Sequence, residues 1–411
     1  MINFESFKLD NGLRVIVHKD TSTPIVAVNV LYNVGAKDED ENKTGFAHLF
    51  EHLMFGGSEN IPVYDEPLEK IGGDNNAFTN NDITNYYLSL PLKNIETAFW
   101  LESDRMLSLD FSQKNLDIQK NVVIEEYKQR YLNQPYGDVW LLLRPLAYKV
   151  HPYKWATIGK DISHIENATL NDVKSFFLNY YRPNNAILSV AGNVSGDTVR
   201  NLTEKWFGSI ESRKIARNNI PPEPVQKEKQ LLVKRGNVPF DVIYKAYHMC
   251  SRTDPQYYAT DLLSDVLSNG KSSRLYTSLV KEKKLFSEIN AYITGDLHKG
   301  LFLISGNLIK GVALEYAEMA IEEEITKLQQ VLIHDDELQK VKNKVDALIR
   351  FSNLRVVDKA LNLAFSELMG NAGLINKELS NYLNVSKEQI RKQAQAVLSV
   401  NNCSTLYYKA N

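Results

Sequence analysis

The chain has few of the residues that mark disulfide-rich, membrane-spanning or nucleic-acid-binding proteins. Its 411 residues include only two cysteines, Cys250 and Cys403. Two cysteines so far apart exclude a disulfide framework and a thiolate zinc site. No run of about 18 apolar residues occurs, so no membrane span is expected. The formal net charge of -2 gives no reason to expect nucleic acid as a partner. A bound metal would therefore depend on imidazole and carboxylate groups.

The first residues also lack the features of an export signal. Residues 1–5 contain no basic start followed by an apolar stretch, which a secretory leader requires. We therefore expect a cytoplasmic protein, or a periplasmic one if a leader has been removed.

Patterns along the chain predict a mixed fold. Residues 13–17, 25–31 and 84–90 alternate or are rich in β-branched side chains, which is typical of strands. Helical periodicity follows the second of these stretches and ends at Gly56 and Gly57. The sequence therefore predicts an α+β fold with a mainly antiparallel sheet covered by helices.

An internal repeat indicates two copies of that fold. The capping box of Thr169 and Asp172 precedes a helix and a strand pattern, and Ser386 with Gln389 opens the same arrangement again. A chain of this length also exceeds what one hydrophobic core usually supports. We predict two homologous domains, residues 1–217 and 229–411, joined by a proline-rich linker at residues 218–228.

One motif points to metal chemistry. His48, Glu51 and His52 are three and four residues apart, so they share one face of a helix. Two imidazoles one turn apart can bind Zn²⁺ at about 2.0–2.1 Å, and the carboxylate can take a proton from water. The alternative is a solvated polar stripe. Because the helix is otherwise apolar, an unpaired polar triplet there would be costly, which favours a metal site.

A catalytic zinc usually has three protein ligands, so a third must come from elsewhere. Helical spacing at residues 116–131 places Glu126 on the apolar stripe that includes Val123, whereas Glu125 falls off it. Glu126 is therefore the preferred third ligand. The alternative is that both glutamates are solvent-facing helix formers.

These motifs resemble those of the pitrilysin and insulysin family of zinc metallopeptidases, whose inverted HxxEH motif matches His48, Glu51 and His52. The resemblance covers nearly the whole chain and is strongest to the short, two-domain processing-peptidase branch. It implies half of a clamshell, a zinc site of His48, His52 and Glu126, and Glu51 as the general base. It also implies a sheet edge on which an extended peptide adds as a strand. The residues of that edge are Asn76, Ala77, Phe78 and Thr79.

The second domain lacks a metal motif, so one Zn²⁺ per chain is expected. The internal repeat places Asp261, Ser264 and Asp265 opposite the three residues of the first motif. His151 and His248 have no partner at ligand spacing, and we interpret both as structural or surface residues.

The chain departs from the family pattern in two places. Where many members carry a second glutamate, two turns before the ligand glutamate, this chain has Gln119, which can orient a ligand but cannot share a proton. The resemblance also implies an arginine and a tyrosine in the second domain that grip the peptide. Lys281 and either Ser287 or Glu288 occupy those positions.

The missing pair predicts a partner for the chain. We expect a heterodimer with a homologous subunit that supplies the arginine and tyrosine, with a homodimer as the second choice. The substrate would be an extended peptide or an unfolded polypeptide segment. Two other functions compete: a non-catalytic scaffold subunit of the same fold, and a small-molecule metallohydrolase.

Overall fold

The computed structural model describes residues 1–411, which fold into two compact units. Unit 1 contains residues 1–128, 155–220 and 349–377, and unit 2 contains residues 129–154, 221–348 and 378–411. Each unit thus includes one segment from the other half of the sequence. The domain limits expected from the sequence, with a linker at 218–228, stay a prediction.

A six-stranded sheet forms the centre of unit 1. Its order is β1 (Glu5–Lys8), β2 (Arg14–Lys19), β6 (Ala186–Gly192), β3 (Ile25–Tyr32), β5 (Thr84–Pro91) and β4 (Asp74–Thr79). β2 and β6 run parallel, and every other neighbouring pair is antiparallel. The central strands β6 and β3 are buried along almost their whole length, because helices cover both faces of the sheet.

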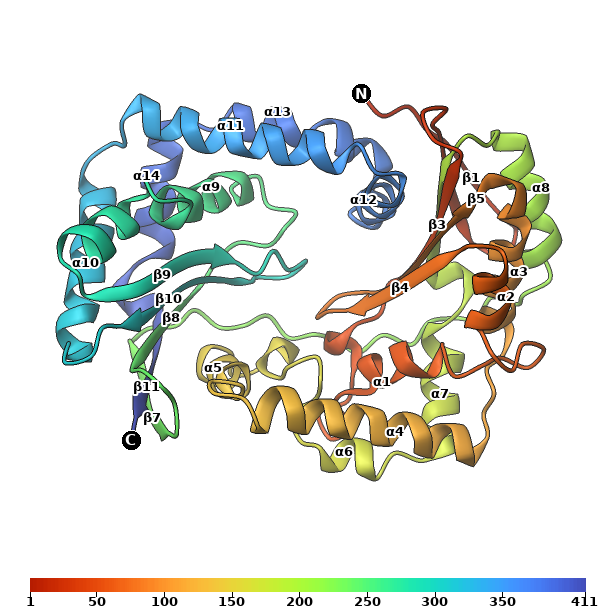
Figure 1. Ribbon diagram of the computed structural model, residues 1–411, viewed down its shortest axis with the longest axis horizontal. Helices are drawn as coiled ribbons and strands as arrows, with labels where there is room; N and C mark the ends of the chain where they lie inside the picture. The colour runs from red at the N-terminus through yellow and green to blue at the C-terminus, as the bar shows by residue number, and fades with distance from the viewer. The chain divides into compact units, whose positions relative to one another are not determined.

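Side-chain alternation gives this sheet two apolar faces. On one face, Ala27 of β3 and Ala191 of β6 pack against Ala360 of α12 (Val356–Leu368). These small side chains allow the helix to approach the strands closely. On the opposite face lie α3 (Ile95–Leu107) and α8 (Gly196–Phe207), which contact each other through Phe99 and Phe207 (Figure 1).

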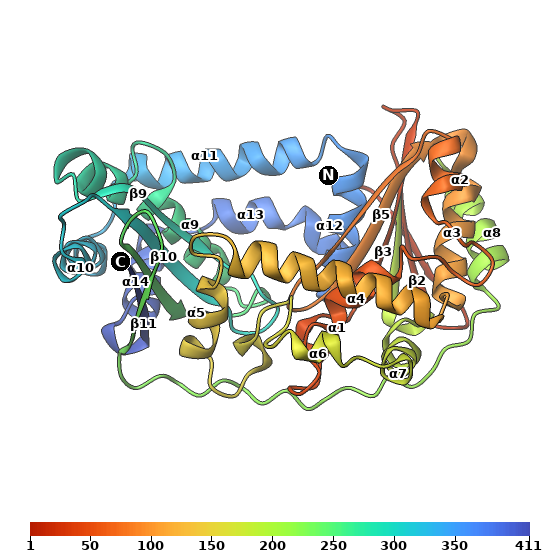
Figure 2. The ribbon, with the colours of Figure 1, turned by 60° about the horizontal axis from the view of Figure 1, so that its bottom comes forward.

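The remaining helices of unit 1 are α1 (Phe46–Leu53), α2 (Asp65–Lys70), α4 (Gln113–Tyr127), α6 (Ser163–Glu166) and α7 (Leu170–Tyr180). α1 packs against α4 and against the hairpin of β4 and β5 (Figure 2). The predicted capping box is present at α7, where Thr169 Oγ1 accepts the Asp172 N–H at 3.2 Å.

Unit 2 is built around a five-stranded sheet. Its order is β7 (Gln230–Gly236), β11 (Cys403–Ala410), β8 (Val242–His248), β10 (Leu301–Leu308) and β9 (Phe286–Ile293). α5 (Val139–Ala147) packs against it through Val139 and Leu143. The other helices are α9 (Tyr257–Ser268), α10 (Leu314–Gln330), α11 (Asp335–Ser352), α13 (Glu378–Leu383) and α14 (Lys387–Val397). The buried Lys245 of β8 pairs with Glu318 of α10 at 2.5 Å.

The two sheets have matching topology, which supports the predicted duplication. In each sheet, one parallel pair is followed by three antiparallel strands: β2, β6, β3, β5 and β4 correspond to β7, β11, β8, β10 and β9. The predicted α+β class with two homologous sheet-and-helix units is confirmed. Among the helices, none has the length and apolar composition that a bilayer crossing requires.

Candidate metal centre

The helix α1 carries the three residues of the HxxEH motif on its less buried side. Its apolar residues, including Leu49 and Phe50, are buried and fix the helix to the rest of unit 1. The side chains of His48 and His52 keep 13% and 24% of their surface exposed. Their rings lie 4.9 Å apart and nearly perpendicular. The motif is therefore sheltered but open to a ligand.

Glu126 of α4 joins the two histidines in space. Its Oε2 lies 3.6 Å from His48 Nε2 and 3.4 Å from His52 Nε2, and the three candidate ligand atoms lie within 4.8 Å of one another. Two atoms that bind one tetrahedral zinc ion at about 2.1 Å are about 3.4 Å apart. The observed separations are longer than the roughly 2.7–2.9 Å of a charge-assisted hydrogen bond. The donor types and their spacing therefore fit Zn²⁺.

The neighbouring glutamate points elsewhere. The Glu125 side chain is 60% exposed, and its Oε1 accepts a hydrogen bond from Lys128 Nζ at 2.7 Å. The Glu126 side chain is only 17% exposed. α4 thus presents Glu126, and not Glu125, to the histidines. Gln119 lies two turns before Glu126 on the same helix and is half-buried.

The side chain of Glu51, on α1, lies against Thr79, the last residue of β4. Burial raises the pKa of the Glu51 carboxyl, while a hydrogen bond from the Thr79 hydroxyl and the charge of His52 lower it. A raised pKa makes a carboxylate a stronger acceptor for a proton near neutral pH. The same interaction places Thr79, expected from the sequence to lie on a sheet edge, beside the HxxEH motif.

The strand β4 is an edge strand, paired with β5 alone. The Asn80 N–H donates to Ile83 O within the hairpin. The backbone N–H and C=O groups of every second residue of β4 therefore point toward β5, and those of the residues between them point outward. Ala77 and Thr79 are among the outward set, which agrees with the hydrogen bond from the Ala77 N–H to the Asn76 side chain. Phe78 faces β5 with its backbone groups. The outer edge therefore presents the Ala77 C=O to another strand, and also the Ala77 N–H, which would exchange the Asn76 side chain for the incoming strand.

A buried charged cluster, which no sequence motif indicated, lies beside Phe55 in the turn that follows α1. The Arg105 side chain donates to both oxygens of Glu102, at 3.0 and 2.5 Å. Its guanidinium lies 4.3 Å from the ring centre of Tyr86 and 4.6 Å from that of Tyr64. The Tyr86 hydroxyl donates to Phe50 O in α1 at 3.3 Å. The one available signal is the three charged residues Glu102, Asp104 and Arg105 on a helix that also carries apolar residues.

Comparison with known proteins identifies the family. Residues 14–152 match the model of the insulinase family, peptidase family M16, and residues 167–345 match the model of the peptidase M16 inactive domain. The chain is 32% identical over 378 residues to zinc protease PqqE of Helicobacter pylori, which covers 89% of this chain and 84% of that protein. The chain belongs to the peptidase M16 family.

Two further proteins are similar to this M16 chain. The crystal structure of a protease from Helicobacter pylori matches it with a TM-score of 0.93 at 29% identity, and both chains are covered completely. A probable mitochondrial-processing peptidase subunit beta of Arabidopsis thaliana is 23% identical over 349 residues, 82% of this chain and 65% of that protein. The expected resemblance to the pitrilysin and insulysin family is confirmed.

The second unit of this M16 chain has carboxylates where the first has its HxxEH motif. Asp261, Ser264 and Asp265 all lie on α9. Burial raises the pKa of Asp261 to about 6, against a hydrogen bond from the Tyr382 hydroxyl that lowers it. This group contains no imidazole, which agrees with the description of the matching family model as an inactive domain.

The positions expected to hold the arginine and tyrosine of the family are exposed in unit 2. Lys281 lies at the end of a π-helical turn, Tyr276–Glu282. Ser287 and Glu288 follow at the start of β9, where the Ser287 hydroxyl donates to Asn307 O at 3.2 Å. Glu288 accepts a hydrogen bond from Asn290 at 2.8 Å.

His151 and His248 pack against tyrosines in unit 2. The His151 ring lies 4.2 Å from the Tyr153 ring, and its Nδ1 accepts the Tyr153 N–H at 3.1 Å. The His248 ring packs on Tyr148 at 5.2 Å, and burial lowers the pKa of His248. Both therefore act as packing residues.

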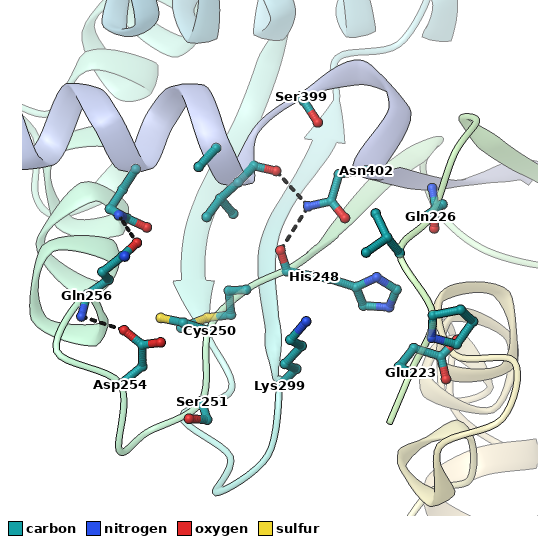
Figure 3. Close-up of a pocket in the computed structure, with 16 residues that line it drawn as sticks. Glu223, Gln226, His248, Cys250, Ser251, Asp254, Gln256, Lys299, Ser399 and Asn402 are labelled. Atoms are coloured by element: carbon teal, nitrogen blue, oxygen red, sulfur yellow. Dashed lines mark hydrogen bonds between the residues drawn. The ribbon is translucent and has the colours of Figure 1, made fainter. Parts of the chain in front are cut away.

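His248 also lines a pocket of about 390 Å³ in unit 2, shown in Figure 3 with Cys250, Lys299 and Asn402. Several polar groups of the lining bond to one another: Asn402 Nδ2 donates to His248 O at 2.8 Å, and the Gln256 N–H donates to Asp254 Oδ1 at 2.8 Å. The buried His248 Nε2, by contrast, has no hydrogen-bond partner.

Proposed function

We propose that this M16 chain is a zinc-dependent endopeptidase that hydrolyses extended peptides or unfolded polypeptide segments, and that it is the catalytic subunit of a heteromer. The observation that supports the activity best is the set of three donor atoms of His48, His52 and Glu126, spaced as ligands of one tetrahedral ion. The name of the H. pylori relative, a zinc protease, agrees with this metal. One Zn²⁺ per chain is proposed, because only unit 1 offers such a set.

When bound, zinc would lower the pKa of water and polarise the peptide carbonyl. Glu51 takes the proton from the attacking water. Its carboxylate lies on the same helix face as His48, and burial raises its pKa. The same group can later deliver that proton to the leaving amine. The Thr79 hydroxyl orients the Glu51 carboxylate through their hydrogen bond. Gln119 is proposed to orient the ligand set from α4.

The substrate is proposed to bind along β4. Ala77 directs its N–H and C=O to the open edge, and Thr79 connects that edge to Glu51. A peptide that adds as a strand makes main-chain hydrogen bonds there, so extended shape matters more than sequence. Asn76 and Phe78 complete the proposed edge. A small-molecule substrate would leave this row of peptide groups unused.

The heteromer is proposed because residues expected at the opposite side of the peptide are missing. Lys281 offers a point charge where a planar guanidinium is wanted, and neither Ser287 nor Glu288 replaces a tyrosine ring. A homodimer would supply the same incomplete set. The Arabidopsis relative is named as a subunit, which agrees with assembly from different chains. A homologous subunit with the arginine and tyrosine would complete the site.

A scaffold subunit of the same fold is the competing function. It would have no need for a complete HxxEH motif, for Glu126 turned toward the histidines, or for a general base beside an open strand edge. Metal analysis and cleavage of unstructured peptides, with and without chelator, separate the two functions. A scaffold would bind less than stoichiometric zinc and cleave nothing, in any combination with partner subunits.

The partner is tested by purifying the chain alone and with candidate homologous subunits from the same source. We expect zinc binding and slow cleavage by the isolated chain, and a higher rate when a subunit that has the arginine and tyrosine is added. Fast cleavage by a preparation free of other subunits would contradict the heteromer and favour a homodimer.

A further inference from the structure

We propose that Glu39 is a positioning residue that, with residues 35–38, sets the metal-site helix α1 in register with the edge strand β4. This inference deepens the proposed function and rests on it. Residues 35–39, named here the strut, are buried and lie between β3 and α1. One end of the strut contacts α1, and the other end contacts the hairpin that carries Thr79.

At the first end, Glu39 caps α1 from outside the helix. Its Oε2 accepts the Gly45 N–H at 2.9 Å, and its Oε1 accepts the Ala47 N–H at 2.8 Å. The N-cap position itself is Gly45, in the left-handed region at φ +87°, and no side chain of its own caps the helix. Glu39 therefore satisfies two of the N–H groups that a helix start leaves free.

This cap determines the rotation of the helix about its axis. Ala47 immediately precedes His48, so a fixed Ala47 N–H fixes the direction in which His48 and His52 point. α1 has only eight residues, too few for a helix to be stable by itself. Its orientation must therefore come from contacts such as this one.

At the other end, the strut is bonded to the β4–β5 hairpin. The Ala36 N–H donates to Asn80 O at 3.1 Å, and the Lys37 N–H donates to Asn81 O at 2.9 Å. The buried Lys37 ammonium donates to Asp82 O at 2.7 Å and lies 3.3 Å from the Asp82 carboxylate. A Cβ at Gly35 would lie 2.6 Å from the backbone of Asn81, so only glycine allows this approach.

The strut thus connects the element that would hold the metal with the element that would hold the peptide. A peptide on β4 can react only if its carbonyl meets the metal and Glu51 at the correct distance, and small misplacements of reacting groups are expensive. Removal of the cap should therefore impair zinc binding and turnover more than it impairs peptide binding.

The test compares two variants, Glu39→Gln and Glu39→Asp, with a control, Asp20→Asn. The amide of glutamine keeps the shape but turns an NH₂ toward one of the two N–H groups, whereas aspartate keeps the carboxyl group and is one methylene shorter. Asp20 is also a buried carboxylate that accepts a backbone N–H, from Ser22 at 2.9 Å. It precedes β3, at the opposite end of that strand from the strut.

In both Glu39 variants, zinc affinity measured by chelator competition should fall on the order of 10- to 100-fold, as for other groups that orient metal ligands. The value of kcat should fall with little change in KM, and the Gly45 and Ala47 amides should exchange hydrogen faster without metal. The Asp20 variant should lose thermal stability but keep zinc affinity and kcat.

Zinc affinity within about twofold of wild type in both Glu39 variants would overturn the inference. If Glu39→Gln does not fold, Glu39→Asp and the wild-type exchange rates decide. Rapid exchange of the Gly45 and Ala47 amides in the wild-type protein would also overturn it. Should the wild type cleave no peptide, the proposed function fails, while the zinc and exchange measurements still test Glu39.

Discussion

Replacing Glu126 by glutamine should weaken zinc binding strongly, whereas the same change at Glu125 should not. The two residues are neighbours on α4 and carry the same charge, but only Glu126 faces His48 and His52. Glu125 is exposed and pairs with Lys128. Glu125→Gln is therefore a control matched in chemistry, helix and net charge.

The size of the effect follows from the geometry. Groups that only orient a metal ligand cost about 10- to 100-fold in affinity when removed, so loss of a direct carboxylate ligand should cost about 100-fold or more, about 2.7 kcal/mol. In the metal-free protein the half-buried contacts of Glu126 with the histidines are worth about 1 kcal/mol or less. The stability without zinc should therefore change little.

Two measurements test this expectation. Chelator competition gives the zinc dissociation constants directly. Thermal unfolding with zinc at about 1,000 times the wild-type dissociation constant should show a stabilisation of about 4 kcal/mol for wild type and for Glu125→Gln. In Glu126→Gln it should fall to roughly 1.4 kcal/mol. Unchanged affinity in Glu126→Gln, or a loss confined to Glu125→Gln, would refute the ligand assignment.

Further predictions concern the base, the edge, the core and acid stability. Glu51→Gln should keep zinc but lose hydrolysis by several orders of magnitude in kcat, because an amide cannot accept the proton. Ala77→Pro removes an outward N–H and should raise KM for peptides with little change in melting temperature, since edge strands tolerate proline there. Arg105→Met should destabilise by about 3–5 kcal/mol in urea unfolding, because the paired carboxylate stays buried without its partner. Despite burial, Lys245 and neighbouring donors lower the pKa of Glu318 from 4.5 to about 2. Its contribution to stability should thus be complete above pH 4.5 and lost as the pH falls toward 2, as acid unfolding can show.

The sequence predicted the elements whose signals are local. The β-branched stretch at 25–31 and the strand pattern that follows the capping box of Thr169 became the buried strands β3 and β6, because strands buried on both faces consist mainly of apolar residues. The capping boxes at Thr169 and Ser386 formed as expected, because each bond joins residues three positions apart. The choice of Glu126 over Glu125 as the third ligand also followed from local periodicity. The structure turns Glu126 toward the histidines, and its role as a ligand stays a prediction.

The exchange of segments between the two halves could not be predicted in this way. α5 and α12 come from opposite halves of the sequence, and each packs on the sheet formed mainly by the other half. An apolar helix face shows that a helix is buried, but not which sheet covers it. α12 meets its sheet through Ala27, Ala191 and Ala360, and small residues of this kind give no distinctive pattern.

The residues that position the candidate site escaped prediction for a related reason. Glu39 and Arg105 are buried, but their hydrogen-bond partners give no sequence signal of burial. Glu102 stands three residues before Arg105, the spacing of an exposed helical pair, and Glu39 accepts from backbone amides six and eight residues further on, so a linear pattern makes both look like surface residues. Burying an ionisable group is costly unless its hydrogen-bond partners are in place. Glu39 and Arg105 therefore favour the one arrangement of α1 in which these partners are present over other arrangements of the helix. The HxxEH motif identifies the chemistry available to the chain. The direction in which a helix of eight residues presents that motif depends on carboxylates and aromatic rings contributed by the strut, α3 and the β4–β5 hairpin.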